Sequence, residues 1–282
     1  MRQHFERTDS WPKLVGIYLA LITMSLVSLY PVWNVFNMSL RPDDTLYSTS
    51  LRLIPVNATW DNYRVMLFEK PLLGWMGNSL IVSLATAMIG VLVSATAGYA
   101  LSRFRFFTRD GFMVFLLTTQ MFPAPMLLLP TFLLLTRLGL LNTYTGMIIP
   151  YAATAIPFSI WMMKGFYDTI PRELEESAYI DGAGNLAAFW RIILPLASPA
   201  LAISALFSFM TAWSEYIIAR VVLTKPELYT LPVGLVTLQS AFATEWGRYS
   251  AGALLTMIPA AALFILLSRF LVSGLTLGSV KG

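Results

Sequence analysis

The ionisable side chains that could do chemistry together lie in the longest polar interruption between the apolar runs expected on the inner side of a membrane, from Pro171 to Pro195. They are Arg172, Glu173, Glu175, Glu176, Asp181 and Arg191. No catalytic set accompanies them, because the chain has no cysteine, a single histidine (His4), no phosphate-binding loop ending in GK[ST] and no nucleophile elbow. We therefore expect no catalytic residues, no His/Cys metal site and no P-loop nucleotide site.

The composition places this polar stretch in a membrane protein. Hydrophobic residues make up 57% of the 282 residues and charged residues only 12%, with a mean hydropathy of +0.67. A soluble domain carries about 25% charged residues, so this chain has too few charges to cover a water-facing surface. The net charge of +4 fits positively charged flanks of membrane spans better than nucleic-acid binding. The charge-free run from Leu14 to Leu40 is too long for a signal-peptide core and is expected to be a retained span.

The charge-free intervals predict an all-α polytopic protein with six membrane spans. A spanning helix needs roughly 20 mostly apolar residues. The spans are expected at about 14–38, 79–101, 112–136, 143–163, 196–218 and 249–267. Residues 1–13 would form an N-terminal tail, and residues 14–282 a single transmembrane domain with a polar loop at 168–195 and a C-terminal tail at 270–282. Gly90, Ser94 and Gly98 are spaced four apart, which predicts close helix packing in the second span.

The distribution of lysine and arginine predicts the orientation. With the N-terminus inside, the inner segments hold 11 of the 19 basic residues and the outer segments 8, and the short inner loop 102–110 has three arginines. By the positive-inside rule, both termini and the polar stretch are expected on the cytoplasmic side. The outer segments 41–77 and 224–248 are then either docking faces for an external protein or simple connections between spans.

Glu215 is the best candidate for ion coupling, because ionisable residues within spans usually mark such a function. It lies 19 residues after Leu196. That distance is about 28 Å along a helix, near the far side of a hydrocarbon core of roughly 30 Å. We therefore expect an interfacial residue rather than a midplane proton carrier. An ion-coupled secondary transporter remains an alternative function, and a membrane scaffold without transport a third.

The polar stretch predicts a helix, a glycine turn and a second helix. Pro171 suits the first position of a helix, the glutamates that follow suit its positive end, and Gly182 can end it in the left-handed conformation. Asn185 can cap a second helix over 186–193. Such a hairpin either ties two spans together or receives mechanical work from a soluble partner. A narrow face of the first helix would suit a shallow socket: Leu174, Ser177, Ala178 and Asp181.

The spacing of this stretch resembles the EAA motif, EAA-x3-G-x9-I-x-LP, of the membrane subunits of binding-protein-dependent ABC importers. Glu176-Ser177-Ala178 lies three residues before Gly182, and Ile192-x-Leu194-Pro195 follows after nine more, with Ser177 in place of the usual alanine. Asp181-Gly182-Ala183 matches the DGA variant of the carbohydrate branch. The QMFP sequence at 120–123, RLGL at 137–140 and the tail from 274 to 282 resemble maltose/maltodextrin-type permeases.

This resemblance implies a permease subunit with the type I ABC importer fold in a bacterial or archaeal cytoplasmic membrane. The subunit would translocate maltose, maltodextrin, trehalose or a similar oligosaccharide by alternating access. It would not be an enzyme and would hold no cofactor, since ATP and Mg²⁺ would be bound by a separate ATPase. Its partners would be a second, non-identical permease subunit, two ATPase subunits and an extracytoplasmic sugar-binding protein.

The resemblance also implies three sets of site residues. The surface that couples to the ATPase would comprise Glu175, Glu176, Ser177, Ala178, Asp181, Gly182 and Ala183. The C-terminal tail would contact the ATPase dimer through Gly278, Ser279, Val280 and Lys281. The loop between the fifth and sixth spans would dock the binding protein through Gln239, Ser240, Ala241 and Phe242.

Overall fold

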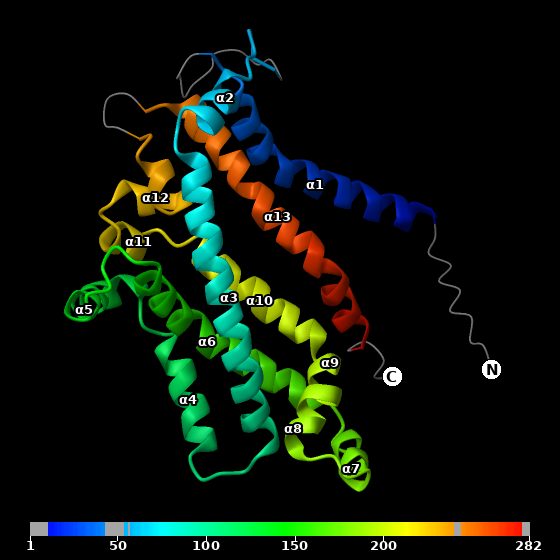
Figure 1. The fold of residues 1–282 in the computed structure, drawn as a ribbon. Coiled ribbons are helices and arrows are strands. Elements are labelled where there is room, and N and C mark those ends of the chain that lie inside the picture. The colour runs from blue at the N-terminus through cyan, green and yellow to red at the C-terminus, as the bar shows by residue number, and fades with distance from the viewer. Residues whose placement is uncertain (1–10, 43–53, 56, 240–243, 278–282) are drawn as a thin grey trace. The chain divides into compact units, whose positions relative to one another are not determined.

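The computed structural model describes residues 11–42, 54–55, 57–239 and 244–277, and this part of the chain is helical without strands (Figure 1). The chain divides into two compact units. The first contains Met1–Lys70 and Leu238–Leu255, and the second contains Pro71–Thr237 and Thr256–Gly282.

The first unit contains α1 (Trp11–Ser39), α2 (Asp61–Phe68) and the start of α13 (Trp246–Leu277). The buried side chain of Asn62 on α2 donates hydrogen bonds to the carbonyl oxygens of Ser39 (2.9 Å) and Arg41 (2.8 Å). These bonds satisfy carbonyl groups that the end of α1 leaves without helical partners. They fix α2 against the end of α1.

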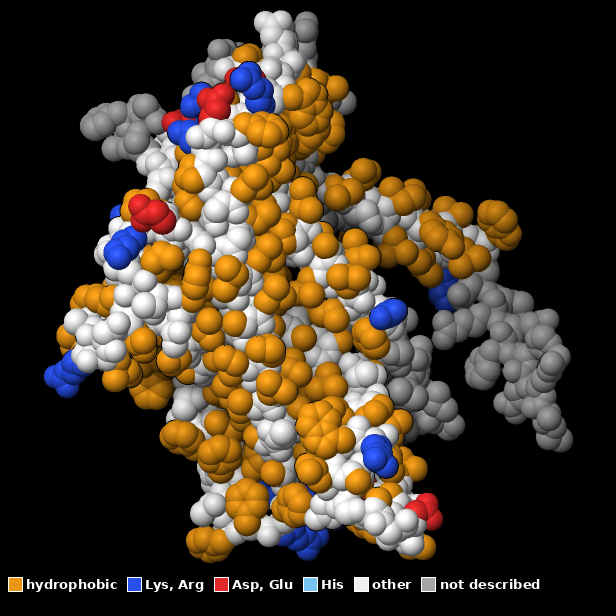
Figure 2. Space-filling view, in the orientation of Figure 1, with side chains coloured by type: hydrophobic (Ala, Val, Ile, Leu, Met, Phe, Trp, Pro, Cys, Tyr) orange, Lys and Arg blue, Asp and Glu red, His pale blue; other side chains and the backbone are white. Residues whose placement is uncertain are grey.

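The second unit is built on three long helices, α3 (Leu72–Arg103), α6 (Tyr144–Thr169) and α10 (Ser198–Trp213). Hydrophobic side chains cover most of the face shown over α3 and its neighbours (Figure 2). The remaining elements of the unit, besides the rest of α13, are α4 (Arg109–Thr119), α5 (Ala124–Arg137), α7 (Glu173–Ile180), α8 (Asn185–Ala188), the π-helix η1 (Phe189–Ile193), α9 (Leu194–Leu196), α11 (Ile217–Val222), the 3-10 helix η2 (Pro226–Leu228) and α12 (Leu231–Val236).

Small side chains of α3 make its contacts with α6 and α10 close, which confirms the packing expected from their spacing. A Cβ atom on Gly90 would lie 2.5 Å from Ser208 Oγ of α10. One on Gly98 would lie 2.8 Å from the Cβ of Met163 on α6. The hydroxyl of Ser94 lies 3.0 Å from that of Ser204 in the buried α3–α10 contact. Small residues of this kind are typical of helix interfaces in membranes.

Four helices among the described residues are long and apolar enough to cross a membrane: α1, α3, α6 and α13. A fifth span results if Asn185–Leu196 and Ser198–Trp213, which are bent by 77°, count as one. The range 112–136, expected as one span, is instead two helices of 11 and 14 residues. Pro123 explains the break, because it lacks an N–H donor and disfavours helical geometry at Phe122, the residue before it, whereas Pro125 lies in the first turn of α5, where proline is tolerated. Pro123 is extended, with φ −61° and ψ 128°.

Candidate coupling site

The polar stretch folds as a helix, a glycine turn and a second helical segment, as expected. Helix α7 ends at Ile180, and Gly182 follows with φ +84°, in the left-handed region that glycine adopts without strain. The Gly182 N–H donates to the Tyr179 carbonyl at 3.0 Å, which closes the turn. The second segment differs from the expected helix 186–193, because it consists of α8 and the π-helix η1. The expected cap at Asn185 is wrong: Gly184 occupies the cap position, and no side chain caps α8.

The structure divides the expected coupling residues into an outward set and an inward set. The side chains of Glu176, Ser177 and Asp181 are exposed, as is Gly182, and Ala183 is half-buried. Glu175 and Ala178 face the interior of the chain, with exposures of only 4% and 7%.

Apolar side chains beside this turn were missed by the sequence interpretation. Ile180 is 87% exposed and Leu186 is 72% exposed. They could have been found in the sequence from one signal: two large apolar residues lie on either side of a glycine turn and outside any expected membrane span. Contiguous exposed apolar patches are typical of protein–protein or membrane interaction sites.

Buried Glu175 is held by two side chains from the last turns of α3. The Tyr99 hydroxyl donates to Glu175 Oε1 at 2.6 Å. Arg103 Nε lies 2.5 Å from Glu175 Oε2, an ion pair in which that N–H does not have hydrogen-bond geometry. The side chains of this ion pair are only 8% and 5% exposed. Arg103 also donates through Nη2 to the Ile170 carbonyl at 3.0 Å, so it holds the linker that leads into α7.

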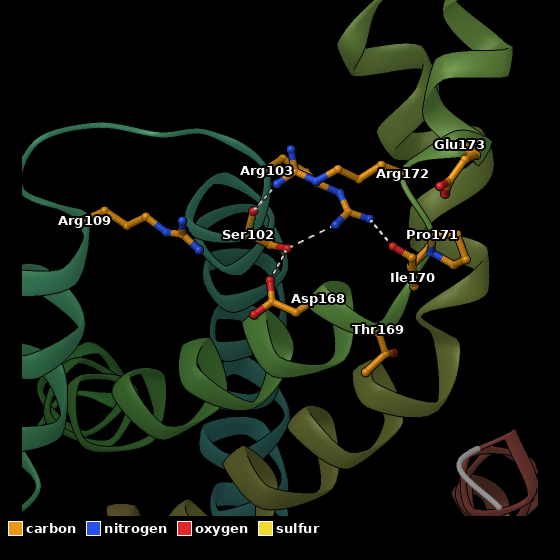
Figure 3. A pocket seen from close by; sticks show the side chains of 9 residues that line it. All are labelled: Ser102, Arg103, Arg109, Asp168, Thr169, Ile170, Pro171, Arg172 and Glu173. Carbon is orange, nitrogen blue, oxygen red and sulfur yellow. Dashed lines mark hydrogen bonds between the residues drawn. The ribbon is translucent and has the colours of Figure 1, made fainter. Parts of the chain in front are cut away.

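A second polar cluster joins the ends of α3 and α6 (Figure 3). The Ser102 hydroxyl donates to Asp168 Oδ1 at 2.6 Å, and Lys164 Nζ donates to Asp168 Oδ2 at 2.6 Å. Arg172 Nη2 donates to the Ser102 carbonyl at 3.3 Å. Ser102, Asp168 and Arg172 line a cavity of about 600 Å³, into which Arg109 also points (Figure 3).

Glu215 lies beyond the C-terminal end of α10, at Trp213. The Tyr151 hydroxyl donates to Glu215 Oε2 at 2.6 Å, and the backbone N–H groups of Ile218 and Ala219 donate to its carboxylate at 2.8 and 3.1 Å. These bonds cap the start of α11 and occupy both oxygens. A capping role therefore accounts for Glu215, and nothing here favours ion coupling.

The other expected site residues lie mostly outside the described residues. This applies to Gly278, Ser279, Val280 and Lys281 and to Ser240, Ala241 and Phe242. Gln239 is described, and its side chain is exposed. Across the part of the chain that the structure covers, no group of three or more His, Cys, Asp or Glu residues could hold a metal ion.

Comparisons with known proteins show which proteins this chain is similar to. The chain is 38% identical over 274 residues to the galactooligosaccharides transport system permease protein GanQ of Bacillus subtilis (strain 168), with 96% of each chain covered. It is 35% identical over 268 residues to the maltodextrin transport system permease protein MdxG of the same organism, covering 94% of this chain and 95% of that one. A chain of a crystal structure of a bacterial ABC transporter that imports the acidic polysaccharide alginate matches with a TM-score of 0.77 and 25% identity, over 95% of this chain and 99% of that one. Residues 67–276 match the family model described as the binding-protein-dependent transport system inner membrane component. The chain belongs to this family and is the membrane-embedded permease subunit of an ABC importer, with the fold of that class.

Proposed function

We propose that this chain carries an oligosaccharide across the cytoplasmic membrane by alternating access and takes up mechanical work through the loop 168–195. Relatives over nearly the whole chain are named for galactooligosaccharides and maltodextrins, which supports an oligosaccharide as the substrate class. The observation that carries the proposal is the α7–α8 turn. It presents two exposed apolar side chains, Ile180 and Leu186, beside the exposed acidic residues Glu176 and Asp181.

As an importer permease, the chain is not catalytic, and ATP hydrolysis belongs to a separate ATPase subunit. A partner permease, an ATPase and a substrate-binding protein complete an importer of this family. We propose that the assembly contains one non-identical permease and two ATPase subunits, which bind the ATP and Mg²⁺. Both termini would be cytoplasmic. The arginine-rich segment 103–109 lies next to the start of α7 within the second unit. By the positive-inside rule, this supports a cytoplasmic position for α7.

The proposed coupling surface consists of the outward set, Glu176, Ser177, Asp181, Gly182 and Ala183, with Ile180 and Leu186 added. Apolar side chains ringed by polar ones are typical of the core and rim of a protein interface. Glu175 and Ala178 would support this surface from within the chain. On the basis of the resemblance, the tail 278–281 remains a proposed ATPase contact and the loop 239–242 a proposed docking site for the binding protein.

The substitution Gly182→Pro tests the proposal. Proline fixes φ near −65° and lacks an N–H, whereas Gly182 has φ +84° and donates to Tyr179. The turn must therefore be rebuilt. In the full complex reconstituted into proteoliposomes, uptake of labelled maltodextrin or galactooligosaccharide should be abolished, while membrane insertion of the subunit persists.

The matched control is Gly184→Ala. Gly184 has φ −81°, and a Cβ atom there would meet nothing within 4 Å, so alanine fits. Uptake by this variant should stay within about twofold of the native rate, since surface changes of this kind alter stability by less than about 0.5 kcal/mol. Native uptake by Gly182→Pro would contradict the coupling assignment.

A further inference from the structure

We propose that Glu175 is a positioning residue that locks α7 to the end of α3, so that motion delivered to α7 moves α3 with it. This inference rests on the proposed function, in which an ATPase moves α7. It assigns Glu175 a role inside the chain rather than in the contact with the ATPase.

The first argument is the burial of one carboxylate among three on a short helix. Glu173 and Glu176 on α7 are exposed, whereas Glu175 is 4% exposed. An isolated buried carboxylate is strongly unfavourable, and it becomes tolerable only when paired and hydrogen-bonded. On α3, the Tyr99 hydroxyl hydrogen-bonds one oxygen of Glu175 at 2.6 Å, and Arg103 forms an ion pair with the other at 2.5 Å. Its side chain therefore offers almost no surface to another subunit.

The second argument is the geometry of α3. Tyr99 and Arg103 are four residues apart, so they lie on the same face of the helix. Together they hold both oxygens of Glu175, and Arg103 also bonds the carbonyl of Ile170 in the linker before α7. Helix α3 thus contacts α7 itself, at Glu175, and the linker that precedes it, at Ile170.

The third argument is that α6 is also bonded to the end of α3 that holds α7. Ser102 of α3 is bonded to Asp168 of α6, and Arg172, just before α7, is bonded to the Ser102 carbonyl (Figure 3). Residues 170–172 connect α6 to α7 without helical structure, and such a linker alone would transmit little displacement. The Glu175 contacts bypass this linker and connect α7 directly to a 32-residue helix.

A double-mutant cycle in the full complex tests the proposal. Glu175→Gln and Arg103→Gln should each lower sugar uptake per ATP hydrolysed by about tenfold while ATPase binding stays within about threefold. Residues that act as one unit are non-additive, so the double variant should lose no more than either single one. Arg137→Gln is the control, since Arg137 is exposed at the end of α5 and should behave as native.

Loss of ATPase binding in Glu175→Gln but not in Arg103→Gln would show that Glu175 contacts the ATPase directly, and would overturn the proposal. Native coupling in both variants would also overturn it. Absence of uptake of every oligosaccharide by the native complex would instead refute the proposed function.

A second measurement leaves Tyr99, Arg103 and Glu175 unchanged, and it covers the case in which the Glu175 and Arg103 variants do not assemble. The chain has no cysteine, so spin labels can be attached at Thr96→Cys on α3 and Glu173→Cys on α7, both exposed positions, with cysteine-free partner subunits. The distance between the labels should be the same in the nucleotide-free and ATP-bound complexes. A distance that changes between these states would overturn the proposal, because α7 would then move independently of α3.

Discussion

Gly98→Ala should weaken the contact between α3 and α6. An added Cβ would lie 2.8 Å from Met163 Cβ and 3.0 Å from the Lys164 backbone nitrogen. Carbon atoms in ordinary contact are about 3.5–4.0 Å apart. The obstructing atoms are a Cβ and a main-chain atom, neither of which can swing away, so the helices themselves must separate. Overpacking of this kind costs about 1–3 kcal/mol.

Gly77→Ala is the matched control, because it makes the same chemical change in the same helix. A Cβ on Gly77 would meet nothing within 4 Å. Both variants gain the helix propensity of alanine, about 1 kcal/mol over glycine. The difference between them therefore isolates the steric cost, and Gly98→Ala should be less stable than Gly77→Ala by about 1–3 kcal/mol.

Unfolding of the isolated subunit by SDS in mixed micelles, followed by tryptophan fluorescence, measures this difference. Gly98 lies one turn before Ser102, so separation of the helices should also lengthen the Ser102–Asp168 bond and lower sugar uptake. Equal unfolding free energies for the two alanine variants, within about 0.3 kcal/mol, would refute the reasoning from close packing.

Two further predictions concern polar contacts elsewhere. Asn142 has φ 53°, in the left-handed region. Its side-chain oxygen accepts from the Thr224 backbone N–H at 2.7 Å, and its side-chain nitrogen donates to the Thr224 hydroxyl at 2.9 Å. Asn142→Ala should therefore lower the free energy of unfolding by about 2 kcal/mol in the same assay, and Asn142→Asp should lower it less. Burial alone would raise the pKa of Glu245, but hydrogen bonds from Arg248 and Lys70 lower this pKa below the ordinary value of 4.5. The ionised carboxylate therefore adds stability above about pH 4.5, and this stability is lost as the pH falls through the lowered folded value. Glu245→Gln should be less stable than native by up to about 1 kcal/mol at pH 7, and this deficit should shrink as the pH falls below 4.5; a deficit that does not change with pH would contradict the ion-pair account.

The membrane class and the helix and glycine turn at 173–182 were predictable because each depends on local signals. Long charge-free intervals predicted α1, α3, α6 and α13, and the glycine after an acidic segment predicted the end of α7. The break between α4 and α5 was not predicted, although Pro123 lies at it. Proline alone is not a sufficient signal here, since Pro150, Pro157 and Pro259 lie inside continuous helices.

The inward position of Glu175 could not be predicted, because its partners are distant in the sequence. Tyr99 lies 76 residues before Glu175, and no local pattern joins them. The expected outward face was divided for the same reason: Ala178 packs inward, while Leu174, Ser177 and Asp181 remain exposed.

Glu175 and Glu176 are neighbours in sequence, but about 100° apart around the helix, so one can face α3 while the other faces solvent. This separation allows one short helix both to receive force and to pass it on. Helix α3 has 32 residues and is about 48 Å long. Near its other end, the buried Asn78 donates to the carbonyls of Glu227 and Tyr229 at 2.9 Å each. If α7 moves as proposed, its displacement would reach the segment 227–229 through α3, which is held by polar contacts near both ends, and it would enter α3 at the buried carboxylate of Glu175.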